Sequence, residues 1–471
     1  MSSKPALRML ALAASVLLAA CAHVDTSIPA VELPTMADKA PAGADRFWTM
    51  FEDDQLTKLV DEALANNRDL KIAVARIEEA RANLRIARSA LYPSLDANAG
   101  ANRSKLSGSI VDVPPGTPLV SNTFNAGVSA AYEVDLWGRL AAGRDAASST
   151  LLATRYAAET VRIALAAQVA STYFALRGFD ADLRLTRDTL VTRDENVRLQ
   201  RSRSAAGVIS ELDLRLAEAE RANVAAAIPA LERAVAQTEA ALARLTGRSA
   251  KRVFEPEIER GRTLDEKVVA PEVPPGLPSD LLMRRPDVRQ AEASLIATRA
   301  LTAEARGQYF PSLTLTGSLG QQSSDLSDLF KAPARVWSLA ANLLQPIIGI
   351  NRIDAEVDAA TSRSEQAAFA YQQSVVDALR DVHDALVAHS SARAAFEAQD
   401  DRRHKQADVL RLAELRYRNG YSSYLEVLDA QRNLLDADRA RLSALRDRQT
   451  AIVDLYRALG GGWTPDQVAA K

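Results

Sequence analysis

A long internal repeat limits the possible folds of this chain more than any other feature of its sequence. Asp69 in the first half corresponds to Asp287 in the second, and Gly207 corresponds to Gly420. The offset between the copies is slightly smaller for the second pair than for the first. The change falls in a region of alternating hydrophobicity, where hairpin loops tolerate changes in length. Each half should therefore fold as one supersecondary unit, with the second half repeating the first.

Each repeat contains one very long helical stretch and a shorter stretch that returns. The long stretches run from Arg139 to Arg203 and from Arg352 to Arg416, and neither contains a proline. At ~1.5 Å per residue each would be roughly 100 Å long. Aromatic residues make up only 5% of the chain, and much of its apolar content is alanine. This composition favours long, closely packed helices over one bulky core.

The sequence period changes from 3.6 to 2 between the helical stretches. Apolar and polar or small residues alternate from Phe124 to Asp135, and more weakly from Leu95 to Arg103. In the second half the alternating segments are 313–320 and 337–343. These patterns predict a β-hairpin in each repeat, with one apolar face.

The strand count bears on membrane insertion. Strands of about 10 residues can cross a bilayer when tilted, with lipid on one face and water on the other. One chain supplies four strands with two edges, and open edges are not tolerated in lipid. Counting strands leaves both two and three copies possible. It also leaves open a periplasmic coiled-coil stalk in which the alternating segments form an ordinary soluble sandwich.

The N-terminus has the features of a bacterial lipoprotein signal. Lys4 and Arg8 precede an apolar run that ends at Cys21, the only cysteine of the chain. That run is too short to span a bilayer as a helix. We expect Cys21 to be acylated as the first mature residue; the alternative is an ordinary signal peptide that leaves a free thiol.

These features predict the following organisation: a lipoprotein signal peptide (1–20), a lipidated tether (21–46), a first repeat (47–250, hairpin about 94–135), a linker (251–276), a second repeat (277–463, hairpin about 312–346) and a C-terminal tail (464–471). A short helix is expected from Phe47 to Asn66, a longer one from Asp69 to Leu91, and one with a kink at Pro229 from Ser210 to Leu245.

The turn between the helices of the second repeat has a detailed signature. Gly420 suits the left-handed residue that closes a helix, and Ser423 with Glu426 forms an S-x-x-E capping box. The first repeat has the same turn at Gly207, with Ser210 in the place of Ser423. These glycines are first of all turn residues.

The sequence offers little support for catalysis, a cofactor or nucleic-acid binding. The four histidines are scattered, and His383 and His389 do not have the ligand spacing of a zinc helix. The net charge is −2 with acids and bases mixed, whereas nucleic-acid binders usually carry a basic face. We predict that the chain is not an enzyme and needs no cofactor.

Nearly the whole mature chain resembles the TolC/OprM-type outer-membrane factors, and most closely their lipoprotein branch, often called NodT-like, which serves RND-type efflux pumps. The stretches that carry the resemblance are FWTMFEDDQL, EVDLWGR, LPSDLLMRRPDVRQAE, YFPSL, SYLEVLDAQRNLL and LYRALGGGW. One departure is QPIIGINR at 345–352, where relatives more often have an aromatic residue and paired glycines; we expect a local change of bend there.

The resemblance implies a homotrimer with a 12-stranded outer-membrane β-barrel and a periplasmic α-helical barrel. It implies a periplasmic adaptor and an inner-membrane RND-type transporter as partners. It also implies that Leu425, Asp429 and Arg432 lie at the constricted periplasmic end, with Leu425 and Asp429 as rings across the pore. The alternative is that Asp429 merely pairs with Arg432 on a solvated face.

The same resemblance implies that the turns at Gly207 and Gly420 contact the adaptor. Trp137 and Trp337 could lie at the rim of the barrel, or could simply pack. The resemblance therefore implies a passive duct that exports small molecules such as drugs and toxic organics. The alternatives are a type I secretion duct and a periplasmic structural lipoprotein without a pore.

Overall fold

The computed structural model describes residues 46–107, 118–264 and 285–461. The signal peptide, Cys21, the tether up to residue 45, the second part of the linker and the C-terminal tail lie outside the described residues. The described chain divides into two compact units, and each unit takes residues from both repeats. Ile77–Thr154 and Ala291–Gln372 belong to the first unit, and the helical remainder forms the second.

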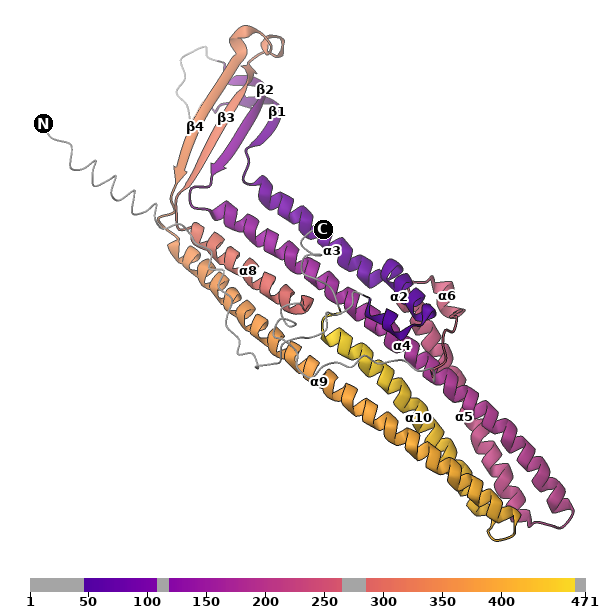
Figure 1. The fold of residues 1–471 in the computed structure, drawn as a ribbon. Helices are drawn as coiled ribbons and strands as arrows, with labels where there is room; N and C mark the ends of the chain where they lie inside the picture. Colours follow the sequence, from indigo (N-terminus) through magenta and orange to yellow (C-terminus); the bar gives the residue numbers. More distant parts are fainter. Residues whose placement is uncertain (1–45, 108–117, 265–284, 462–471) are drawn as a thin grey trace. The chain divides into compact units, whose positions relative to one another are not determined.

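The first unit contains a four-stranded antiparallel sheet with the strand order β1-β2-β3-β4 (Figure 1). The strands are β1 (Ser94–Lys105), β2 (Val120–Val134), β3 (Ser312–Ser323) and β4 (Arg335–Leu344). Both predicted hairpins are therefore present, and they join through β2 and β3. Among the described strands, β1 and β4 each have one neighbour, so the sheet has two open edges.

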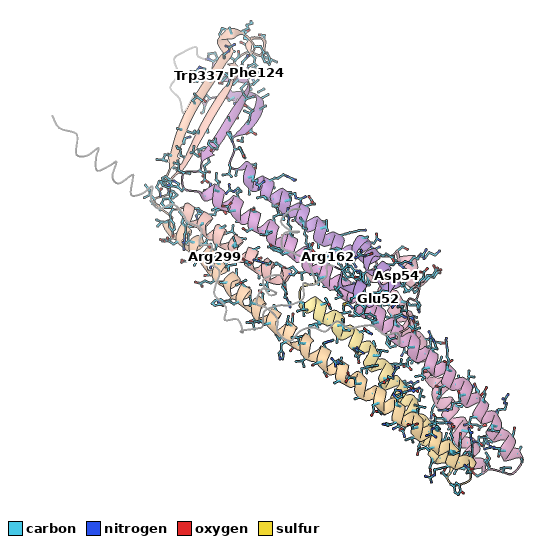
Figure 2. All side chains as sticks on the ribbon, in the orientation of Figure 1. Glu52, Asp54, Phe124, Arg162, Arg299 and Trp337 are labelled. Carbon is cyan, nitrogen blue, oxygen red and sulfur yellow. The ribbon has the colours of Figure 1, made fainter. Side chains whose placement is uncertain are left out.

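The strand register collects the apolar residues on one face. One row across the sheet pairs Ala97 with Val128, Val128 with Leu319, and Leu319 with Trp337. The next row runs from Asp96 through Ser129 and Ser318 to Ser338, in which the last two hydroxyl oxygens are 2.8 Å apart. Because neighbouring residues of a strand point to opposite faces, one face is apolar and the other polar. Trp337 is 72% exposed on the apolar face (Figure 2).

The long helices extend slightly beyond their predicted bounds. α4 (Arg139–Ala205) has 67 residues and α9 (Ile350–Arg418) has 69. The other α-helices are α2 (Asp54–Asn66), α3 (Arg68–Ser89), α5 (Glu211–Leu245), α6 (Ala250–Phe254), α8 (Pro286–Gly307) and α10 (Tyr424–Ala458). α5 continues through Pro229. Within the described ranges, no helix has an apolar stretch long enough to cross a membrane.

Small residues let the helices of the first unit approach closely. A Cβ on Gly307 of α8 would lie 2.8 Å from the Cβ of Arg139 on α4. Thr302, also on α8, donates a hydrogen bond to the carbonyl oxygen of Ala360 on α9 at 3.1 Å. The close approach of α8 and α4 therefore requires the small residue Gly307.

The predicted helix from Phe47 to Asn66 is wrong in one respect, because it is two elements. A 3-10 turn, Phe47–Phe51, ends at Glu52, whose φ is +49°. Asp53 then caps α2, and its Oδ1 accepts hydrogen bonds from the backbone amides of Gln55 and Leu56 at 2.9 and 3.0 Å. The carboxylate satisfies donors that a new helix start leaves free.

The main core of the helical unit gathers the few aromatic residues. Phe47, Trp48 and Phe51 are at most 2% exposed and pack with Tyr173 of α4 and with residues of α5 and α10. Ile258 and Leu264 join the same core. The first part of the segment predicted as a linker therefore packs against the helices. The predicted bounds of the linker, 251–276, stay a prediction.

Candidate functional site

Two helix–helix turns form one end of the helical unit (Figure 1). α9 ends with Gly420 at φ +77°, and the amide of Tyr421 donates to the carbonyl of Arg416 at 2.9 Å. α4 ends in the same way at Gly207, with φ +71°. These hydrogen bonds are those of the Schellman motif, which favours glycine because other residues are strained at positive φ. Both predicted turn glycines are confirmed.

The two turns differ at the start of the following helix. Ser210 caps α5, since its hydroxyl oxygen accepts a hydrogen bond from the amide of Asp213 at 3.2 Å. Ser423 stands at the equivalent position before α10, but its side chain makes no capping hydrogen bond. The predicted capping box of Ser423 and Glu426 is therefore wrong, although Ser423 has the extended backbone of a cap residue, with φ −77° and ψ 160°.

The predicted gate residues lie on α10 but differ in their surroundings. Leu425 is 49% exposed, and Asp429, one turn further on, is also exposed. Residues four apart share one face of a helix, so these two side chains belong to the same exposed surface. Arg432 is half-buried, and its Nε donates to Oε2 of Glu220 on α5 at 2.5 Å. The structure thus separates Arg432 from the other two by giving it a partner within the chain.

Glu220 lies at the centre of a group of three charged side chains, two of them buried, which we call the tip triad: Arg193 of α4, Glu220 of α5 and Arg432 of α10. The Glu220 side chain is 4% exposed, and its Oε1 is 4.0 Å from Nε of Arg193, whose side chain is 7% exposed. The triad connects the first helical hairpin with the second. Removing one member of a buried ion pair is strongly destabilising, because the remaining charge stays buried without compensation.

The electrostatics of the two arginines differ because their burial differs. Burial lowers the pKa of Arg193, and the nearby Glu220 carboxylate acts against that shift. The hydrogen bond to Glu220 raises the pKa of Arg432, which the charge of Asp429 also raises. Arg193 therefore depends on Glu220 more than Arg432 does, since Arg432 is partly solvated.

A polar layer with incomplete hydrogen bonding accompanies the triad. Nε of Arg193 and Oε1 of Gln200 and Gln431 are buried without a hydrogen-bond partner. Tyr424 is 3% exposed, and its hydroxyl oxygen accepts a hydrogen bond from Asn196 at 2.5 Å. Buried polar groups without partners are costly, so this layer stabilises the end of the helical unit less than the apolar cluster around Leu428 at the same end.

Sequence reasoning missed Glu220 and Arg193. Glu220 lies one helical turn after Ala217 and one turn before Val224, and both of these apolar residues are buried. An acid at this spacing lies on the packed face of a helix, which is the signal that could have revealed it. The repeat could not, because aligning Gly207 with Gly420 places Glu220 on Asn433.

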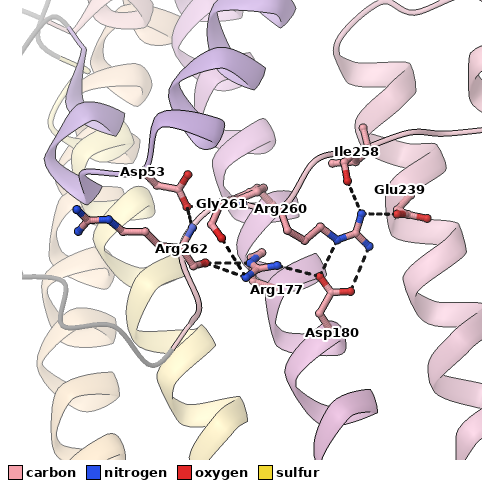
Figure 3. A network of polar contacts seen from close by, with 9 residues as sticks. Asp53, Arg177, Asp180, Glu239, Ile258, Arg260, Gly261 and Arg262 are labelled. Carbon is pink, nitrogen blue, oxygen red and sulfur yellow. Dashed lines mark hydrogen bonds and ion pairs between the residues drawn. The ribbon is translucent and has the colours of Figure 1, made fainter.

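A second polar network holds the segment after α6 against the helical unit (Figure 3). The hydroxyl of Tyr173, which is fully buried, donates to Oδ2 of Asp53 at 2.8 Å and accepts from the amide of Gly261 at 3.1 Å. The amide of Arg262 donates to the same Asp53 oxygen at 3.2 Å. Burial, followed by the hydrogen bond to Asp53, raises the pKa of Tyr173.

Two arginines extend this network (Figure 3). Nη2 of Arg177, whose side chain is 5% exposed, donates to the carbonyl oxygen of Arg262 at 2.9 Å. Nε of Arg260 donates to Asp180 at 2.9 Å, and its Nη1 donates to Glu239 at 2.5 Å. The segment is therefore fixed by charged hydrogen bonds, which are stronger than neutral ones.

In the RRPDVRQAE stretch, Arg285 stands directly before α8 and makes hydrogen bonds to three parts of the helical unit. Its guanidinium donates to Asp287 at 2.6 Å, to Asp381 of α9 at 3.1 Å and to the carbonyl oxygen of Ala458 of α10 at 3.0 Å. Arg285 is 8% exposed and therefore ties the start of α8 to α9 and to the end of α10. Several acceptors satisfy the planar fork of donors that only arginine offers.

Within residues 46–107, 118–264 and 285–461, no group of His, Cys, Asp and Glu side chains is placed to hold a metal ion. Trp137 packs rather than projects, because its ring stacks on Phe310 with centroids 4.9 Å apart and its Nε1 donates to the carbonyl oxygen of Pro311 at 2.8 Å. Cys21 lies outside the described residues, so its acylation stays a prediction.

Comparison with known proteins gives a consistent result. A model of the family described as "Outer membrane efflux protein" matches residues 59–248 and 277–461. The chain is 38% identical over 418 residues to the solvent efflux pump outer membrane protein SrpC of Pseudomonas putida, covering 88% of this chain and 87% of the relative. It is 36% identical over 474 residues to the outer membrane protein OprJ of Pseudomonas aeruginosa, covering 98% and 97%. The structure matches the Campylobacter jejuni CmeC outer membrane channel with a TM-score of 0.86 and 26% identity, over 93% of this chain and 95% of that one.

Proposed function

Since the chain belongs to the outer membrane efflux protein family, we propose that it forms the passive outer-membrane duct of a tripartite efflux pump. The observation that carries this proposal is the register of the four strands, which builds one continuous apolar face and one polar face. A face of each kind suits a wall with lipid on one side and water on the other.

We propose a homotrimer as the working state. One chain has a sheet with two open edges, and backbone groups at an open edge cannot face lipid. Three copies give 12 strands (3 × 4), which can close a barrel with a lumen. α4 and α9, with 67 and 69 residues, would form the wall of a helical barrel. The predicted ranges of the two repeats, 47–250 and 277–463, belong to the same proposal.

The gate is assigned to the exposed surface of α10. Three copies of Leu425 would form an apolar ring and three copies of Asp429 an acidic one. Rings of charged side chains and apolar constrictions are two ways in which a pore can be selective or closed. Arg432 has a different role in this proposal: through Glu220 it holds α10 against α5, so that the rings stay narrow.

The partners are a periplasmic adaptor and an inner-membrane RND-type transporter, which supplies the energy. The turns at Gly207 and Gly420 are the surfaces that the adaptor would contact. Acylation of Cys21 would add a lipid anchor. The duct itself performs no catalysis and holds no cofactor.

The proposed cargo is small organic molecules such as solvents and drugs. This proposal is supported by the relatives, because SrpC is named for solvent efflux. The test is deletion of the gene from its host, followed by growth in toluene, dyes, detergents and antibiotics. We expect increased sensitivity to several of them, restored by the wild-type gene and not by a version truncated before α10.

Two results would contradict the proposal. One is an unchanged sensitivity to all four classes together with loss of a secreted protein, which indicates a type I secretion duct. The other is a purified full-length chain that is monomeric and gives no conductance in planar bilayers, which indicates a structural lipoprotein without a pore. A trimer with measurable conductance supports the duct.

A further inference from the structure

The two repeats differ sharply where the sheet passes into the long helices. After β2, Asp135 accepts hydrogen bonds from the backbone amides of Leu140 and Ala141, at 3.1 and 2.8 Å, and so caps α4. When Arg139 is aligned with Arg352, Ile348 takes the equivalent position after β4. An isoleucine side chain cannot accept a hydrogen bond, so Ile348 cannot perform the role of Asp135. The second repeat has an aliphatic residue where the first has a capping acid.

This replacement exposes apolar surface. Ile347 is 82% exposed and Ile348 is 97% exposed, and Gly349 follows with φ +98°. Single exposed apolar residues are common on proteins, whereas two adjacent isoleucines exposed this fully mark a contact with an apolar partner. We call Ile347 and Ile348 the isoleucine pair.

The surroundings of the pair indicate which partner this is. The pair follows the end of β4 after two residues, and on the apolar face of β4 Leu339 and Leu343 are 80% and 68% exposed. No charged residue occurs from Val336 to Asn351. Side chains on this face stand perpendicular to the sheet, so pairing of the β4 edge with another strand covers its backbone and leaves the face free. That face is the one that meets lipid in an outer-membrane protein.

We propose that the isoleucine pair inserts into the acyl-chain region of the inner leaflet of the outer membrane. Burying two isoleucine side chains in hydrocarbon is favourable in proportion to the apolar area removed from water. The pair thereby fixes how deep the strand–helix junction sits. Asp135, its counterpart in the first repeat, stays at the polar boundary. This inference rests on the outer-membrane location of the family and adds a specific contact to it.

Depth-dependent fluorescence quenching tests the proposal on the full chain. Ile348→Cys is labelled with bimane and reconstituted in vesicles of phosphatidylethanolamine and phosphatidylglycerol that contain a lipid with a shallow doxyl group. Leu339→Cys serves as the control within the sheet. Val208→Cys, at the turn after α4 and 71% exposed, serves as the aqueous control, and unmutated protein gives the background from Cys21.

We expect the doxyl lipid to quench the Ile348 probe severalfold more than the Val208 probe, and iodide in solution to quench it severalfold less. Iodide quenching equal to that of Val208 would overturn the proposal, because the pair would lie in water. Protection from both quenchers would also overturn it, because another copy of the chain would cover the pair. If the Leu339 probe also fails to respond to the doxyl lipid, the membrane assignment of the sheet itself fails. This control therefore distinguishes failure of the proposed function from failure of the inference about the isoleucine pair.

Discussion

Substitution of Glu220 by Gln should loosen the end of the helical unit that carries the proposed gate. The change removes the charge that Arg193 and Arg432 share, at 4.0 and 2.5 Å, and leaves the size of the side chain nearly unchanged. Breaking a buried ion pair from one side costs about 3–5 kcal/mol. The low end of this range applies, because the Arg432 side chain is 41% exposed and can turn to water, whereas Arg193 cannot.

Hydrogen exchange of the trimer measures this effect locally. A loss of about 3 kcal/mol in the opening free energy corresponds to exchange on the order of 100-fold faster. The acceleration should be confined to amides of α4, α5 and α10 near the triad, with the aromatic core around Tyr173 unchanged. Conductance in planar bilayers should rise as well, since Arg432 would no longer hold α10 against α5.

Glu218→Gln is the matched control, close by on the same helix. Glu218 pairs with Arg201 and Arg215 on the surface, where ion pairs contribute little. Its exchange rates should stay close to those of the wild type. Equal exchange in the Glu218 and Glu220 variants would refute the reasoning, because the triad would then contribute no more than a surface pair.

Four further outcomes follow from the structure. Asp429→Ala should raise the leak conductance if Asp429 closes the pore, whereas Asp436→Ala, at another exposed acid of α10, should not. Equal conductance of the two variants would show that Asp429 is an ordinary surface acid. Gly420→Ala should destabilise its turn by roughly 1–2 kcal/mol, because φ is +77°, and Gly420→Asn should cost less in thermal unfolding. Because the pKa of Tyr173 is raised in the folded state, its neutral hydroxyl stabilises the fold fully below about pH 10. Above that pH this contribution to the free energy of unfolding falls by about 1.4 kcal/mol per pH unit. Tyr173→Phe should therefore flatten the decline of thermal stability between about pH 9 and 11. Cys21→Ser should abolish incorporation of labelled palmitate, and continued labelling would contradict acylation at Cys21.

Local patterns predicted the fold well because the two periods of this chain are clear. The alternation from Phe124 to Asp135 follows from the pleat of a strand, and β2 covers almost the same residues. Gly207 and Gly420 were predictable because few residues other than glycine adopt positive φ at a helix end. The helix from Phe47 was predicted as one element because its break depends on Asp53, whose second set of contacts, with Tyr173 and Arg262, joins distant parts of the chain.

The contacts between helices were not predictable from spacing, because they join residues far apart in the chain. Arg432 was assigned to the gate with Leu425 and Asp429, and the heptad spacing of these residues gave no sign of Glu220, which lies on a helix of the other repeat. The same limit applies to Arg285, whose partners lie on α9 and α10. A repeat helps only where both halves keep the same residue, and such pairs are mostly turns and packing positions.

The tip triad has no counterpart at the repeat-related positions, and this difference between the two repeats has a consequence for the movement of α10. Aligning Gly207 with Gly420 places Arg432 on Ala219 and Glu220 on Asn433, so neither member of the ion pair has a charged counterpart in the other repeat. If both repeats carried the pair, each helical hairpin would hold the other through the same contact, and all the turns around the axis would be fixed alike. With one pair, the first hairpin provides the buried acid and the second provides the arginine next to the proposed gate residues. α10 can then move away from α5 by breaking one ion pair and the apolar contacts around Ala217, while the aromatic core holds the remainder of the helical unit together.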